Sequence, residues 1–197
     1  MSSGKPETRR AILEAAQRLF VEHGPSAVRM VDIARSAGVT RQAVYLHFGS
    51  RTNLLVALVQ YVDEVNDLAE LARPVWEAPT AVEALSRLVS LNAVYNPRIY
   101  PIVKALMSNR YADEAIAAAW DDRMQSRWDA CQGLILRLKE EETLRLVDDL
   151  DRATDLLWTL TSHQVWEQLV IDQGWPAARY EEHLSAVLRR TFVVDNE

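Results

Sequence analysis

The stretch that most constrains the fold of this chain is residues 28–51, with the sequence VRMVDIARSAGVTRQAVYLHFGSR. It predicts two short helices joined by a tight turn, over residues 30–37 and 41–47, because apolar residues recur at helical spacing in both parts. Gly38 is the predicted stop of the first helix, since glycine readily takes the left-handed conformation of a helix C-terminus. Thr40 is a good N-cap for the second helix, because its hydroxyl can accept a backbone N–H. The segment therefore predicts a helix-turn-helix unit.

The second helix of this unit leaves polar side chains for an exposed surface. Arg41 and Gln42 stand at its start, and these are the residue types that form paired hydrogen bonds with guanine and adenine in the major groove. A helix-turn-helix presents such a helix start to base edges. The pattern favours DNA binding, and the alternative that it leaves open is an ordinary helical hairpin with a polar face.

At these residues the chain resembles the TetR family of transcriptional regulators. The segment IARSAGVTRQAVYLHFGSR is similar to the DNA-binding signature of that family, I-A-x-x-A-G-V-S/T-x-x-x-x-Y-x-H-F-x-S-K, which is followed by a leucine pair, here Leu54 and Leu55. Arg51 replaces the signature lysine and keeps its positive charge. Thr52 and Asn53 stand where acidic residues are common. Neither departure removes the cation expected to bind phosphate.

The rest of the chain shows helical periodicity and no strand pattern. Further helices are expected over residues 7–23 and 51–72, from Thr80 onward, from Asn96 and Pro97 onward, and over residues 112–142, 149–171 and 176–193. We therefore expect an all-α fold of about nine helices. A three-helix DNA-binding domain over residues 1–50 would precede a larger helical ligand-binding and dimerisation domain over residues 51–197.

Charge is divided between the two ends of the chain. Residues 1–51 carry a net charge of +4 and the remainder carries −10, although the whole chain is at −6. Such a division fits a basic end that meets phosphate and an acidic end that does not. The single cysteine, Cys131, excludes an internal disulfide. Without a signal-like N-terminus or an apolar run of about 20 residues, a cytoplasmic protein with no membrane partner is expected.

No residue constellation indicates catalysis or metal binding. His163 and His183 are separated by an expected helix boundary, Cys131 has no histidine near it in sequence, and a glycine-rich phosphate loop is absent. We therefore expect no enzymatic activity, no metal and no cofactor.

The six tryptophans all follow residue 75, and most fall on expected long helices. An apolar pocket between such helices would suit a small hydrophobic or aromatic effector, and nearby polar residues would need a partner. The expected ligand-binding residues are Asn92, Trp120, Met124, Trp128, Trp158, Ser162, His163 and Trp166. The alternative is that the tryptophans only fill the core.

The resemblance implies a ligand-responsive regulator, most simply a repressor that binds a palindromic operator as a homodimer through its last two helices. Arg41 and Gln42 are expected to contact bases. The residues expected mainly to hold phosphates are Arg29, Thr40, Tyr45, His47 and Arg51. A functional alternative from a different class is a helical small-molecule binding protein without operator-specific DNA binding.

Overall fold

The computed structural model describes residues 4–145 and 149–194. Secondary structure in these ranges is helical, apart from an isolated antiparallel bridge between Leu144 and Val193. The prediction of an all-α fold is confirmed. The chain forms two compact units, here called the N-terminal unit (Met1–Asn66 with Ile99–Met124) and the C-terminal unit (Asp67–Arg98 with Gln125–Glu197). The functional boundary expected at residue 50 stays a prediction.

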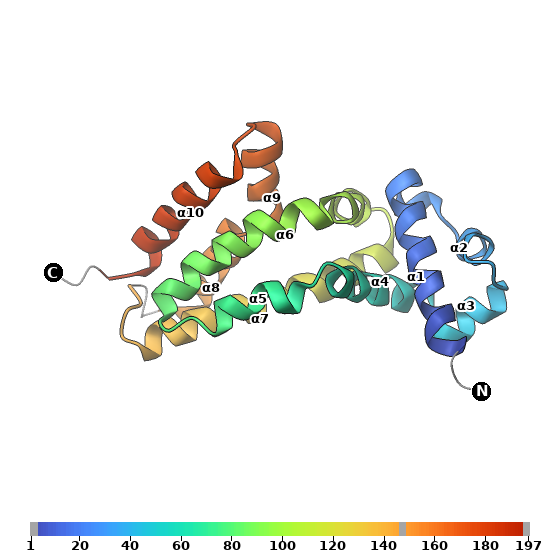
Figure 1. Ribbon diagram of the computed structural model, residues 1–197, viewed down its shortest axis with the longest axis horizontal. Coiled ribbons are helices and arrows are strands. Elements are labelled where there is room, and N and C mark those ends of the chain that lie inside the picture. The colour runs from blue at the N-terminus through green and yellow to red at the C-terminus, as the bar shows by residue number, and fades with distance from the viewer. Residues whose placement is uncertain (1–3, 146–148, 195–197) are drawn as a thin grey trace. The chain divides into compact units, whose positions relative to one another are not determined.

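The N-terminal unit begins with three helices that pack on one another, drawn in blue in Figure 1. They are α1 (Gly4–His23), α2 (Met30–Ser36) and α3 (Arg41–Phe48), with a short 3-10 turn, η1 (Pro25–Ala27), after α1. Helix α1 contacts α2, α3 and α4 (Arg51–Val65). Its buried stripe contains Ile12, Leu13, Ala16 and Phe20, at the three- and four-residue spacing of one helix face.

Local capping sets the boundaries of the helix-turn-helix. Gly38 has a φ of +68° in the turn after α2. Thr40 Oγ1 accepts the backbone N–H of Ala43 at 3.1 Å at the start of α3, and Ser50 Oγ does the same for Asn53 at the start of α4. The predicted helix-turn-helix is therefore confirmed, with boundaries that differ by one residue from those expected.

The single helix expected over residues 51–72 is wrong. Helix α4 ends at Val65, and α5 (Leu68–Trp76) follows after a turn. Asp67 in that turn has a φ of 57°, a left-handed conformation that Asp adopts more readily than most residues. The Asn66 side chain donates to the Val62 carbonyl at 2.8 Å and closes the end of α4. Pro74, expected to end the helix, lies inside α5.

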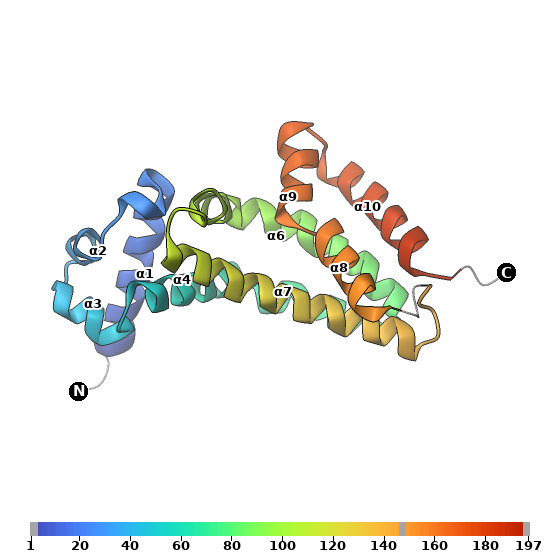
Figure 2. The same ribbon diagram turned by 180° about the vertical axis from the view of Figure 1, so that it is seen from behind.

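The C-terminal unit contains α5, α8 (Leu150–Leu160), α9 (His163–Trp166), a π-helical turn η2 (Glu167–Asp172) and α10 (Ala177–Phe192). Two long helices, α6 (Ala81–Asn109) and α7 (Glu114–Glu140), contribute to both units. Figure 2 shows α8, α9 and α10 following one another along the chain. Helix α10 contacts α8 and η2, and it buries Tyr180, Leu184, Leu188 and Phe192.

The helix start expected at Asn96 and Pro97 is wrong, because α6 continues through both residues and through Pro101. Each proline removes one backbone N–H from the helix ladder. Both prolines are exposed, and they are four residues apart, so they lie on one side of α6. The opposite side buries Tyr95, Asn96 and Ile99.

The continuous helix expected over residues 149–171 is also wrong. It is interrupted at Thr161 and Ser162, and Ser162 Oγ caps α9 by accepting the Val165 backbone N–H at 3.2 Å. The described residues hold ten α-helical segments, close to the expected nine, because two breaks add segments and the continuous α6 removes one.

Candidate functional site

The exposed side of α3 carries three of the seven residues expected to meet DNA, namely Arg41, Gln42 and Tyr45. Arg41, Gln42, Tyr45 and Leu46 are exposed, whereas Val44 and Phe48 are buried against the rest of the N-terminal unit. Apolar anchors therefore hold one face of the helix, and the other face is open to a partner.

Arg41 and Tyr45 form a local pair on this face. The Arg41 guanidinium carbon lies 5.4 Å from the centre of the Tyr45 ring, and Arg41 Nη2 is 3.5 Å from Tyr45 Oη. The pair combines a cation with an aromatic hydroxyl one helical turn further on. Such a pair offers hydrogen-bond donors to a phosphate or a base edge.

At the start of α2, Arg29 is tied to Asp32. The Asp32 carboxylate accepts the Arg29 backbone N–H at 3.1 Å and Arg29 Nε at 3.0 Å. The hydrogen bonds from the Arg29 side chain and then its backbone hold the pKa of Asp32 below its usual range. The Arg29 side chain remains 76% exposed, so it is accessible from solvent while it is paired.

Arg51 is more deeply engaged than the sequence suggests. Its Nη2 donates to the Pro25 carbonyl at 2.6 Å and forms an ion pair with Asp113 Oδ2 at 3.1 Å. Asp113 Oδ1 in turn accepts the backbone N–H groups of Ala115 and Ile116 at the start of α7. Arg51 therefore links η1, α4 and the start of α7 within the N-terminal unit.

Four of the expected DNA-binding residues line one groove. Arg29, Arg41, Tyr45 and Arg51 surround a hollow of about 420 Å³, and Asp113 lies among them. Three guanidinium groups against one carboxylate give this groove a positive balance, which suits an anionic ligand. Gln42, Thr40 and His47 are not part of its lining.

Thr40 and His47 have different surroundings. The Thr40 hydroxyl oxygen caps α3, and its own proton stays available for donation. His47 is half-buried, and its ring centre lies 6.2 Å from that of Phe48. By helical spacing His47 lies away from the side that carries Gln42 and Leu46, so it is less accessible than Arg41, Gln42 and Tyr45.

A buried polar cluster in the C-terminal unit contains three of the expected ligand-binding residues. Asn92 Nδ2 donates to the Thr161 carbonyl at 3.3 Å, and His163 Nδ1 is 3.1 Å from Asn96 Oδ1. Ser162 and His163 are both buried. The structure thus brings α6 together with the break between α8 and α9.

Two polar atoms of the C-terminal unit are buried without a hydrogen-bond partner: Asn96 Nδ2 and Tyr180 Oη. Burial raises the pKa of Tyr180, and the nearby Asn92 side chain and the Arg127 charge partly oppose this rise. A buried polar atom without a partner is costly, by about 1–3 kcal/mol. Such atoms are where a bound molecule has most to contribute.

Arg127 connects this cluster to α8. Its Nη2 donates to the Thr161 carbonyl at 2.9 Å and lies 3.4 Å from the Trp158 carbonyl, and its guanidinium carbon is 5.8 Å from the centre of the Trp158 ring. The Arg127 charge also lowers the pKa of the Cys131 thiol, although burial raises it by more.

The tryptophans expected to line a pocket have separate environments. Trp166 is 2% exposed, and Trp128 Nε1 donates to Asp155 Oδ1 at 2.9 Å. Trp120 and Met124 belong to the N-terminal unit, where Arg110 lies 5.0 Å from the Trp120 ring centre. The roles of these side chains in ligand binding stay predictions.

Asn96, Arg127 and Tyr180 are not among the site residues that the sequence predicts. The proline at position 97 makes Asn96 look like a helix start, although α6 continues through it. In a continuous helix, Asn92 and Asn96 share one face, and that spacing was the available signal. Arg127 follows Met124 by three residues and precedes Cys131 by four, so it stands at the edge of an apolar stripe, which is a weak signal for a half-buried cation.

Across residues 4–145 and 149–194, no group of three or more His, Cys, Asp or Glu side chains is placed to hold a metal ion. No helix within those same ranges combines the length and apolar character that a membrane span requires.

The family model described as bacterial regulatory proteins, tetR family, matches residues 12–58. This match covers the helix-turn-helix, from the buried stripe of α1 to the first half of α4.

Individual transcriptional regulators are also similar to this chain in sequence. The regulator TtgR of Pseudomonas putida is 44% identical over 61 residues, which are 31% of this chain and 29% of that protein. The alignment therefore spans less than a third of TtgR.

Solved structures match over nearly the whole chain. NalD, the secondary repressor of the MexAB-OprM multidrug efflux pump in Pseudomonas aeruginosa, superposes with a TM-score of 0.78 and 25% identity, covering 99% of this chain and 100% of that chain. A complex of SmeT with triclosan has a TM-score of 0.75 at 20% identity, over 96% of this chain and 93% of the other. The second likeness concerns the fold alone.

Proposed function

Because this chain belongs to the TetR family of bacterial regulatory proteins, we propose that it is a ligand-responsive DNA-binding transcriptional regulator, most simply a repressor. The observation that carries the proposal is the exposed face of α3, held from behind by Val44 and Phe48 within a helix-turn-helix. TtgR and NalD are named as regulators, and no enzymatic activity is proposed for this chain. A DNA-binding regulator acts where the chromosome lies, so we propose a cytoplasmic location.

The proposed roles follow the accessibility of each side chain. Gln42 is exposed on α3 and suits paired hydrogen bonds with adenine in the major groove. Arg41 lies beside Tyr45 and suits guanine or a neighbouring phosphate. Arg29 and Arg51 line the groove next to them and suit the DNA backbone.

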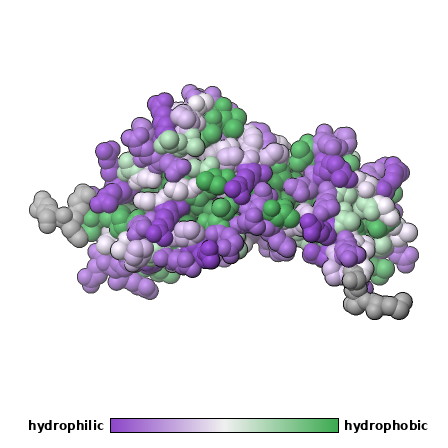
Figure 3. All heavy atoms as spheres, viewed as in Figure 1, coloured by the Kyte–Doolittle hydropathy of each residue, from purple (hydrophilic) through white to green (hydrophobic). Residues whose placement is uncertain are grey.

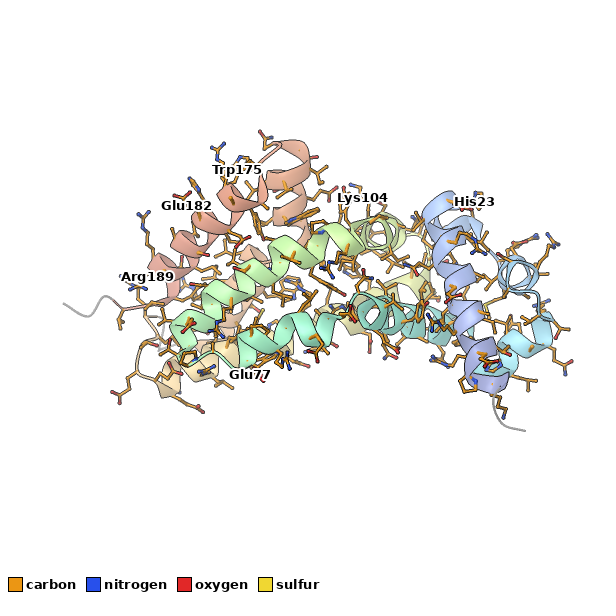
Figure 4. All side chains as sticks on the ribbon, viewed as in Figure 1. His23, Glu77, Lys104, Trp175, Glu182 and Arg189 are labelled. Atoms are coloured by element: carbon orange, nitrogen blue, oxygen red, sulfur yellow. The ribbon has the colours of Figure 1, made fainter. Side chains whose placement is uncertain are left out.

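We propose a homodimer formed through η2 and α10 together with α8. Ile171 and Val187 are 48% and 42% exposed on these elements, which is high for aliphatic side chains of a folded chain. Glu182 and Arg189 extend from the same helix α10, as Figure 4 shows, and would form a polar rim around such a contact. Two-fold pairing would present two α3 helices to a palindromic operator.

The proposed effector site includes the buried polar cluster of the C-terminal unit. Asn96 Nδ2 and Tyr180 Oη lack partners there, and Trp158 and Trp166 belong to the elements that frame the cluster. A small molecule with an aromatic or hydrophobic body and one or two hydrogen-bond acceptors fits this chemistry. SmeT, which shares the fold, is complexed with triclosan, a precedent for such a molecule in this architecture.

The replacement Gln42→Ala tests the proposed function. It is expected to weaken binding to the cognate operator by roughly 1–3 kcal/mol and to relax the base preference at one position of each half-site. Affinities for the operator and for a scrambled duplex would be measured side by side by fluorescence anisotropy. The matched control is Gln60→Ala, which removes an exposed glutamine from α4.

Discrimination between the two duplexes should fall for Gln42→Ala and stay at the parental level for Gln60→Ala. If the Gln42 variant discriminates as well as the parent does, base reading by this face of α3 is wrong.

A further inference from the structure

Leu46 is an apolar side chain that the fold does not use. It is 80% exposed in the middle of α3. Other exposed aliphatic side chains in the described residues, such as Val21 and Ile171, are 47% and 48% exposed. Leu46 therefore gains almost no burial from folding, and a polar residue would suit this position as well for stability.

Its position on α3 relates it to Gln42. Four residues separate the two, so they are neighbours on one face of the helix, one turn apart. Val44 and Phe48 occupy the buried side. Leu46 thus continues the Gln42 face towards the C-terminal end of α3, away from Arg41 at its start.

We propose that Leu46 contacts the 5-methyl group of a thymine in the major groove and makes the protein specific for thymine at that position. This inference rests on the proposed function. The thymine methyl is the apolar group that base edges present in that groove, and an aliphatic side chain reads it by excluding water. The neighbouring Gln42 offers hydrogen bonds to an adjacent base, so the two side chains read two bases by different chemistry.

Charge on the same surface favours DNA as the occupant. Arg29, Arg41 and Arg51 line the groove beside α3, and Asp113 is the acidic residue in that lining. An exposed leucine on the same helix as the groove-lining Arg41 suits a partner that presents both methyl groups and phosphates. Figure 3 shows hydrophilic and hydrophobic side chains intermixed on the visible face of the molecule.

The test is a double-mutant cycle between protein and DNA. In the operator recovered with the parent protein, each thymine is replaced singly by deoxyuridine, which lacks only the methyl group. Parent and Leu46→Ala proteins are then compared on every duplex. Because alanine is a good helix former, the variant should fold like the parent, and thermal unfolding checks this.

The expected result is one thymine in each half-site at which loss of the methyl group weakens the parent by roughly three- to ten-fold, as loss of one small apolar contact predicts. Leu46→Ala should bind the thymine and deoxyuridine duplexes equally at that position. In a duplex with a C·G pair at that position, replacing the cytosine by 5-methylcytosine should restore part of the parent's affinity. The control variant Val21→Ala removes part of an exposed aliphatic side chain from α1, and it should lose as much affinity as the parent does when the thymine is replaced by deoxyuridine.

Equal losses for parent and variant at every thymine overturn the proposal and leave the proposed function intact. If the parent protein selects no operator, the proposed function fails and this inference fails with it.

Discussion

Arg51 has a structural role as well as the expected role in phosphate binding. Its bond to the Pro25 carbonyl fixes the segment that leads into α2, and its ion pair with Asp113 joins α4 to the start of α7. The Arg51 side chain is 25% exposed. A phosphate next to Arg51 would meet the negative charge of Asp113, so we expect these two groups to have opposite effects on DNA affinity.

Two replacements separate the effects of this pair. Arg51→Ala is expected to weaken operator and scrambled DNA about equally, to flatten the salt dependence, and to lower the free energy of unfolding by about 1–3 kcal/mol because the Pro25 carbonyl loses its donor. Asp113→Asn should tighten binding to both duplexes a few-fold, since the amide oxygen can still cap α7 while the charge is gone. Titrations at several salt concentrations and urea unfolding measure these effects.

An Arg51→Ala protein with unchanged stability would contradict the structural role. An Asp113→Asn protein with unchanged affinity would show that the carboxylate does not oppose phosphate binding.

Local sequence signals predicted the caps but not this pair. Thr40 and Ser50 accept backbone N–H groups three residues further along the chain. The local sequence is therefore enough to predict that both residues cap a helix. Asp113 is far from Arg51 in sequence, and the two meet only through tertiary structure within the N-terminal unit. Composition and spacing carry no signal for such a contact.

At the scale of elements, two of the three errors in the sequence prediction have one physical origin. Pro97 was read as a helix boundary, yet burial on the other side of α6 keeps the helix continuous. The uninterrupted apolar periodicity of residues 149–171 predicts one continuous helix, yet the helix breaks at Thr161. Local preference was overridden by tertiary contacts in both places.

Arg127 accounts for the stability of that break. An interrupted helix leaves carbonyls without intrahelical donors, and the Arg127 guanidinium bonds to the Thr161 carbonyl and lies near that of Trp158. Asn92 adds a second donor to Thr161. A side chain from α7 and one from α6 thus replace the missing backbone hydrogen bonds.

Arg127→Met is expected to lower the free energy of unfolding by roughly 1–3 kcal/mol, because the freed carbonyls lose a charged donor. Methionine keeps much of the side-chain volume, so a cavity should contribute little. Arg152→Met, which changes an exposed arginine on α8, is the control and should stay within about 0.5 kcal/mol of the parent. Urea denaturation followed by circular dichroism measures both, and equal stabilities would contradict the account of the break.

At the scale of the whole molecule, the positive charge is concentrated in the segment that is proposed to bind DNA. The basic residues of the first 51 positions include Arg29, Arg41 and Arg51, which line the groove beside α3. The excess of acidic residues after position 51 would repel DNA, so we expect contact mainly through the first 51 residues. The sequence predicted this division directly, because it requires only the positions of the charged residues.

The central claim is that this protein reads a two-fold-symmetric DNA sequence through α3. The most direct test is selection of bound fragments from randomised duplex DNA by the full-length parent protein at about 150 mM salt, where non-specific phosphate attraction is screened. The account predicts recovery of a palindromic sequence whose half-site centres lie about 34–36 Å apart, or a multiple of that distance. Recovery of no sequence above background from a well-folded protein would contradict it.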